Sequence, residues 1–122
     1  MTRARGRWPG SVYTVGSEPD PRFTFANERT LLAWIRTSLA LLAAGVALAA
    51  LRTPLSPPIR RIVVLLLLLL ACATSIHSWF AWARAERCLR RSQPLPAPAL
   101  AAPVALGVAG ASALLLIGVL VL

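Results

Sequence analysis

The sequence predicts an all-α integral membrane protein built as a bundle of three transmembrane helices. Apolar residues make up 57% of the 122 residues and charged residues only 14%, whereas soluble domains usually contain about 45–50% and about 25%. The apolar residues are concentrated in three stretches, and we expect spans near residues 30–51, 62–83 and 101–122. A helix of about 20 residues crosses the hydrocarbon core. Because the stretches lack the alternation of barrel strands, helices are the expected spanning structure.

The chain before the first span is expected to be a mobile, basic tail over residues 1–22, followed by the membrane domain over residues 23–122. This tail is rich in glycine, proline and charge, a composition that does not favour a packed core. The first apolar stretch is longer than the about 7–15 apolar residues of a signal peptide, and a mixed polar tail precedes it. We therefore interpret it as a retained helix and not as a cleaved signal.

Arginine placement predicts the orientation in a cell inner membrane. Nine arginines lie in the tail and the second loop, against three in the first loop. The positive-inside rule places the N-terminus and the second loop in the cytoplasm and the C-terminus outside. The three groups are Arg3, Arg5, Arg7, Arg22 and Arg29 in the tail; Arg84, Arg87, Arg90 and Arg91 in the second loop; and Arg52, Arg60 and Arg61 in the first loop.

Residue usage does not favour an enzyme, a metal site or a cofactor site. Cys72 and Cys88 do not form a Cys-x-x-Cys motif, and His77 is the only histidine, so zinc lacks a ligand set. Asp20 is the only aspartate and lies in a proline-flanked segment, which leaves Ser/His/Asp catalysis incomplete. The arginines of the tail are also too few to predict nucleic-acid binding without a folded basic face. We expect no enzyme activity, no cofactor and no nucleic-acid partner.

The most informative segment is the start of the first span. Asn27 is predicted to cap the helix, which would place Glu28 in the first turn. Arg29 and Arg36 are seven residues apart and therefore project from one helix face. A seam of small residues shares that face and is suited to close helix packing; it consists of Ala33, Ala40, Ala43 and Ala47.

The second span offers further cationic groups, because His77 and Arg84 also lie seven residues apart. Together with Arg29 and Arg36 they are candidates to line one cleft, which would suit a phosphate, a polyphosphate or an anionic head group. Alternatives remain open from the residues alone: Arg36 as a snorkelling side chain without a ligand, and His77 in an interfacial hydrogen bond. Back-bonding to helix carbonyls is the alternative for three neighbours, Thr74, Ser75 and Ser78.

Residues 20–40 resemble the signature of the YidH-like family, the domain of unknown function 202 group. The resemblance is carried by Asn27, Glu28, Arg29 and Thr30, followed by an apolar pair, a small residue and Trp34, and it extends over roughly residues 19–122. It implies a small inner-membrane protein whose bacterial function is largely unassigned. A similar domain forms the membrane part of the eukaryotic vacuolar transporter chaperone complex, which makes and translocates polyphosphate. That similarity implies a path for an anion. It also implies that the residues with a role in this path are Asn27, Glu28, Arg29 and Arg36.

Two functions from different classes therefore remain. The first is an oligomeric module that binds or passes a polyanion or an anionic lipid head group at the cytoplasmic side. The second is a structural or accessory subunit whose arginines set topology and pair with carboxylates of another membrane protein. In both cases we expect the partners to be the lipid bilayer and either a second copy of the chain or another membrane protein.

Overall fold

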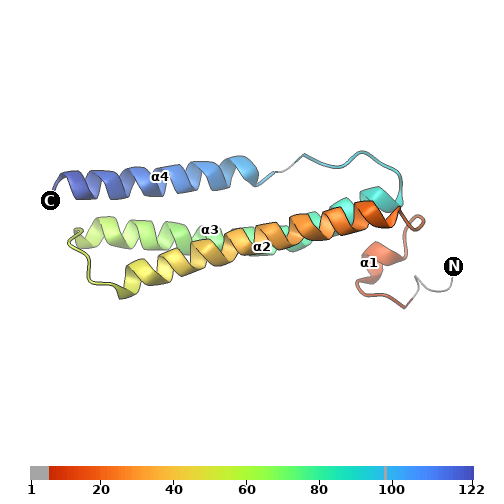
Figure 1. Cartoon of the computed structure of the whole chain (residues 1–122), viewed down its shortest axis with the longest axis horizontal. Helices are drawn as coiled ribbons and strands as arrows, with labels where there is room; N and C mark the ends of the chain where they lie inside the picture. The colour runs from red at the N-terminus through yellow and green to blue at the C-terminus, as the bar shows by residue number, and fades with distance from the viewer. Residues whose placement is uncertain (1–5, 98) are drawn as a thin grey trace.

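The computed structural model describes residues 6–97 and 99–122, and its regular elements are all α-helices. The long helices α2 (Pro21–Ala50), α3 (Pro57–Arg90) and α4 (Ala101–Leu120) run side by side, and a short helix α1 (Gly10–Tyr13) precedes them (Figure 1). The central helix is α3, because it contacts each of the other three. All three long helices are long and apolar enough to cross a membrane. The predicted all-α architecture with three candidate spans is thereby confirmed.

The helices α2 and α3 extend well past the predicted spans. They contain 30 and 34 residues, which corresponds to about 45 Å and about 51 Å at 1.5 Å per residue, against a hydrocarbon core of about 30 Å. Both helices extend past the predicted spans at the end of the bundle where α2 begins and α3 ends. We call this the basic end, and we call the opposite end, with the 51–56 connection, the loop end. The arginines that define the basic end are Arg22, Arg29, Arg84, Arg87, Arg90 and Arg91.

The first span begins earlier than predicted, at Pro21. Asp20 is the N-cap, and its carboxylate accepts a hydrogen bond from the backbone N–H of Arg22 at 2.9 Å. The Arg22 side chain and then its backbone N–H hold the pKa of the Asp20 carboxyl below its ordinary value. Aspartate followed by proline is a strong start signal, since proline at the first helical position needs no N–H partner. The prediction that Asn27 caps the helix and Glu28 lies in its first turn was therefore wrong.

The middle of the bundle is packed by apolar and small side chains. Its core combines Leu41 of α2 with Ala111 of α4 and with three residues of α3, Val63, Leu67 and Ala71. The hydroxyl of Ser38 donates a hydrogen bond to the carbonyl of Ala71 at 2.6 Å across the α2–α3 interface. A Cβ at Gly45 would lie 2.9 Å from Leu68 Cδ2, so glycine permits this close approach.

Part of the tail that was expected to be mobile packs against α3. Val12 of α1 is fully buried and contacts Trp82 and Ala83. A turn at Gly16 (φ +58°) then brings the chain so close to α3 that a Cβ there would overlap the carbonyl of Arg90. Residues 10–18 are thus a packed segment, because the protruding end of α3 offers them an apolar surface and polar partners. Residues 1–5, with Arg3 and Arg5, lie outside the described residues.

Candidate binding site at the basic end

A buried carboxylate joins α2 to α3 at the basic end. Glu86 is 1% exposed, and its two oxygens accept hydrogen bonds from Thr24 Oγ1 at 2.9 Å and from Asn27 Nδ2 at 3.0 Å. Asn27 Nδ2 also donates to the carbonyl of Trp82 at 3.1 Å. A carboxylate buried this deeply requires such donors. The amide of Asn27 therefore pins two helices together, which is a different role from the predicted helix cap.

A buried arginine holds the tail on α3. Arg90 is 3% exposed, and its guanidinium donates to the carbonyls of Tyr13 (3.0 Å) and Val15 (2.8 Å) and to Glu18 Oε1 (3.1 Å). The backbone carbonyl of Arg90 accepts a further bond from the N–H of Ser17 at 2.9 Å. The planar fork of arginine can donate to several acceptors at once. This cluster fixes the tail at the protruding end of α3.

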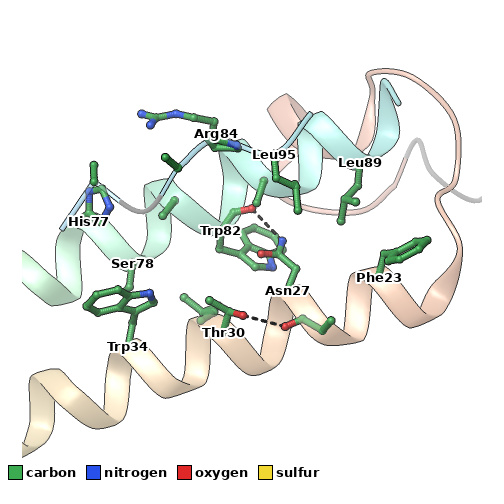
Figure 2. A pocket seen from close by; sticks show the side chains of 17 residues that line it. Phe23, Asn27, Thr30, Trp34, His77, Ser78, Trp82, Arg84, Leu89 and Leu95 are labelled. Atoms are coloured by element: carbon green, nitrogen blue, oxygen red, sulfur yellow. Dashed lines mark hydrogen bonds between the residues drawn. The ribbon is translucent and has the colours of Figure 1, made fainter. Parts of the chain in front are cut away.

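A cavity lies beside these clusters, between α2, α3 and the connection from α3 to α4 (Figure 2). Its volume is about 340 Å³. Apolar and aromatic side chains form most of its wall, and Figure 2 shows Trp82 reaching from α3 toward α2 beside Asn27. The indole N–H of Trp82 is buried and has no hydrogen-bond partner within the described part of the chain. The polar lining residues are Asn27, Thr30, His77, Ser78 and Arg84.

The four predicted anion-binding residues are only partly brought together. His77 and Arg84 line the cavity, and Figure 2 shows Arg84 extending away from α2 at its rim. Arg29 instead lines a shallow second hollow on α2, which shares Thr30 and Trp34 with the cavity. Arg36 lines neither of these hollows and is exposed. The expectation of one cleft with four cationic groups was wrong, because the arginines of α2 lie on the far side of that helix from α3.

The alanine seam of α2 likewise does not pack against the described part of the chain. Ala33, Ala40, Ala43 and Ala47 are exposed together with Arg29 and Arg36, and this face lies about 160° around the helix from Ser38 and Gly45 at 3.6 residues per turn. The side of α2 that meets α3 carries polar, small and large apolar residues at a spacing of three and four residues. Its members are Thr24, Asn27, Leu31, Trp34, Ser38, Leu41, Gly45 and Leu48.

Several hydroxyl groups of α3 are satisfied by their own helix. Thr74 donates to the carbonyl of Leu70 at 2.5 Å, Ser78 to that of Ser75 at 2.7 Å, and Ser75 to that of Cys72 at 3.0 Å. Back-bonding, the alternative left open from the sequence, is thereby confirmed for all three. These hydroxyls are consequently not spare donors for a ligand.

Sequence reasoning missed Glu86 and the buried role of Arg90. Arg90 was counted among the arginines of the second loop, and Glu86 was not singled out. A signal was present in the spacing, because the buried stripe of α3 continues at steps of three and four residues past the apolar stretch. That stripe is Val63, Leu67, Ala71, Thr74, Ser78, Trp82, Glu86 and Arg90.

Comparison with known proteins places the chain in a family. Residues 22–88, more than half of the chain, match the family model described as Domain of unknown function (DUF202). The chain belongs to the DUF202 family. An uncharacterized protein of Mycobacterium tuberculosis is 51% identical over 80 residues, which cover 65% of this chain and 66% of that protein. The inner membrane protein YidH of Escherichia coli is 45% identical over 86 residues, which cover 70% of this chain and 75% of YidH. No solved structure matches the chain.

This DUF202 chain is thus a homologue of an inner membrane protein, and it has three candidate transmembrane helices. The matched region contains nearly all of α2 and α3, including Asn27 and Glu86. It ends at residue 88, so α4 lies outside the match, although the sequence resemblance had been expected to run to residue 122. The match spans slightly less than two thirds of the mycobacterial relative.

Proposed function

We propose that this chain is an oligomeric module of the inner membrane that binds or passes an anion, polyphosphate or an anionic lipid head group, at its cytoplasmic side. The single observation that carries the proposal is the exposure of Arg36 within a span. Among the described residues none forms a salt bridge with its guanidinium. An arginine within a span is unfavourable for insertion, by up to about 3 kcal/mol at the centre and less toward the end where Arg36 lies, and intramembrane charges usually face a partner or water.

Arg29 supports the same proposal, because it lies on the Arg36 face two turns closer to the basic end. The α3 helix covers the opposite side of α2. Copies of the chain that associate through the exposed face of α2 would place these two arginines of each copy beside a shared path. The resemblance to the polyphosphate-translocating membrane domain favours an anion as the occupant of that path.

The proposed orientation places the basic end in the cytoplasm, as nine arginines against three favour. A reporter that is active only in the periplasm should work when fused after Leu122 and fail when inserted within residues 84–98. The reverse result would move the basic end to the other side of the membrane and contradict the proposal.

The decisive experiment compares Arg36→Gln and Arg36→Lys with the parent in detergent. Loss of one arginine that donates to an anion should weaken the binding of short polyphosphate about tenfold or more, in keeping with charged hydrogen bonds. Lysine should restore binding only in part, because an ammonium lacks the bidentate fork. The control is Arg52→Gln at the loop end, where the side chain is exposed. If both Arg36 variants bind polyphosphate and anionic vesicles as the parent does and keep its oligomeric state, Arg36 is a snorkelling residue and the proposal fails.

A second candidate function is an accessory subunit without a ligand of its own. The observation that favours it is the exposed alanine seam, because small residues allow close approach of a helix from another chain. Ala43→Leu should then change the oligomeric state or the recovery of a partner, whereas Leu42→Ile should have little effect. Equal tolerance of both substitutions would mean that the seam is no interface.

A further inference from the structure

The cavity at the basic end exists because α4 is shorter than its neighbours. Gly107 of α4 lies against Leu70 of α3, and Gly118 lies against Leu55 and Ile59. In this antiparallel register the start of α4 at Ala101 is level with about the middle of α3, near His77. Beyond that point α4 is absent beside α2 and α3 (Figure 1), and residues 95–97 of the connection line the groove between these two helices. A groove between the two long helices is therefore left with only an extended segment as its cover.

The segment that covers the groove is suited to an apolar surface, because its backbone has few N–H groups that need hydrogen-bond partners. Residues 95–97 line the cavity, and they have no regular secondary structure. Proline supplies no N–H at positions 94 and 96, so this backbone can lie over an apolar groove with fewer unpaired donors.

The polar groups of the cavity that remain available to a ligand include the side chains of His77 and Arg84 and the indole N–H of Trp82. Thr30 and Ser78 donate to carbonyls of their own helices, and the amide of Asn27 donates to Glu86 and Trp82. By contrast, no hydrogen bond or salt bridge within the described ranges engages the side chains of His77 and Arg84. An arginine and a histidine above an apolar groove are complementary to an anion that carries an apolar tail.

The level of the cavity along the bundle also favours an anion that carries an apolar tail. Its lining on α3 runs from His77 to Leu89, across the point where the apolar stretch over residues 62–83 gives way to charge. The groove therefore faces the head-group level of the leaflet at the basic end. Basic pockets between transmembrane helices at this level commonly bind phosphate head groups of lipids. A polyphosphate chain would gain nothing from the apolar wall, which includes Phe23, Leu31, Trp34, Ala81, Leu89 and Leu95.

We infer that this cavity binds one anionic membrane phospholipid. The head group lies at Arg84 and His77, and one acyl chain lies along the groove between α2 and α3 beneath residues 95–97. The volume of about 340 Å³ is at the lower end of the about 300–1,000 Å³ of small-molecule sites, so the rest of the lipid stays in the bilayer. This site is separate from the Arg36 face and does not depend on the function proposed for it.

The test uses the full chain in phosphatidylcholine nanodiscs that contain a trace of photoactivatable phosphatidylglycerol. Cross-links mapped by mass spectrometry should fall on the cavity wall. Arg84→Gln should lower this labelling about fivefold, as expected for one arginine near a lipid surface. Arg91→Gln is the matched control, since it removes the same charge from an exposed residue outside the cavity. A photoactivatable phosphatidylcholine with the same chains should label the cavity less than phosphatidylglycerol does.

A second variant tests the cavity by changing its volume and not its charge. Ala81→Leu fills part of the cavity and should lower the labelling, whereas Ala73→Leu adds the same volume at an exposed position outside it. Equal labelling of Arg84→Gln, Arg91→Gln and the parent would overturn the inference, as would equal labelling by the two lipids. Complete competition by inorganic phosphate would assign the site to a free anion and would also overturn it. Arg36→Gln should leave lipid labelling unchanged, so this inference and the proposed function fail separately.

Discussion

The middle of the bundle and its basic end use the same two helix faces but different chemistry. In the middle, α2 and α3 meet through Leu41, Gly45, Val63 and Leu67, and a single hydroxyl bond from Ser38 crosses the interface. At the basic end the same stripes continue into polar and charged residues: Thr24 and Asn27 of α2 donate hydrogen bonds to Glu86 of α3, and Arg90 of α3 donates to the tail.

This difference indicates how α2 and α3 remain packed where they extend beyond the bilayer. In lipid there is little hydrophobic gain from helix association, so small residues and close contact hold helices together. Beyond the bilayer, water competes for every polar group, and buried charges are stable only when several partners satisfy them. The tail and the connection to α4 flank α2 and α3 where α4 no longer does, and Arg90 is the residue that attaches the tail.

The largest effect is expected from Arg90→Met, which keeps the length of the side chain and removes its donors. The carbonyls of Tyr13 and Val15 and the carboxylate of Glu18 lose these bonds. Hydrogen bonds to charged groups contribute about 1.5–3 kcal/mol, so docking of the tail should weaken by about 3 kcal/mol. Hydrogen exchange of the Ser17 amide, which donates to the Arg90 carbonyl, should accelerate about a hundredfold.

Arg91→Met is the control for this experiment, because Arg91 is exposed and adjacent. It should leave exchange of the Ser17 amide unchanged. If the amide stays as protected in Arg90→Met as in the parent, the tail is held by Val12 on Trp82 and the guanidinium is unimportant for docking.

A smaller effect is expected from Glu86→Ala. Thr24 then loses its acceptor on α3, and Asn27 keeps only the Trp82 carbonyl. Leaving buried donors without partners should lower the free energy of unfolding by about 2 kcal/mol, measured by denaturant titration in mixed micelles with tryptophan fluorescence. Glu86→Gln retains one acceptor and should lose less than half as much.

The control is Glu28→Ala, since Glu28 is exposed on the same helix as Thr24. This substitution should change the unfolding free energy little. Should Glu86→Gln be as damaging as Glu86→Ala, then the charge of Glu86 and not its acceptor geometry stabilises the basic end.

The sequence alone predicted the parts of the fold that depend on apolar length. Three long stretches without breaks have few alternatives to three helices, and the family resemblance at Asn27 to Trp34 agrees with the matched family. It did not predict which face of α2 meets α3, because the alanine seam and the stripe through Ser38 and Gly45 are both suited to packing. Nor did it predict the buried state of Glu86 and Arg90, since charged residues near a helix end are usually solvated.

The smallest effect concerns the middle of the bundle and compares Gly45→Ala with Gly110→Ala. Both substitutions gain the same helix propensity, but only Gly45 has a neighbour, Leu68 Cδ2, at 2.9 Å from the added Cβ, whereas nothing lies within 4 Å at Gly110. Because a leucine side chain can shift, the overpacking should leave Gly45→Ala less stable than Gly110→Ala by about 1 kcal/mol, measured by the same denaturant titration. Equal stability would mean that α3 and α2 separate without penalty in the middle, and that the polar contacts of the basic end hold the two helices together.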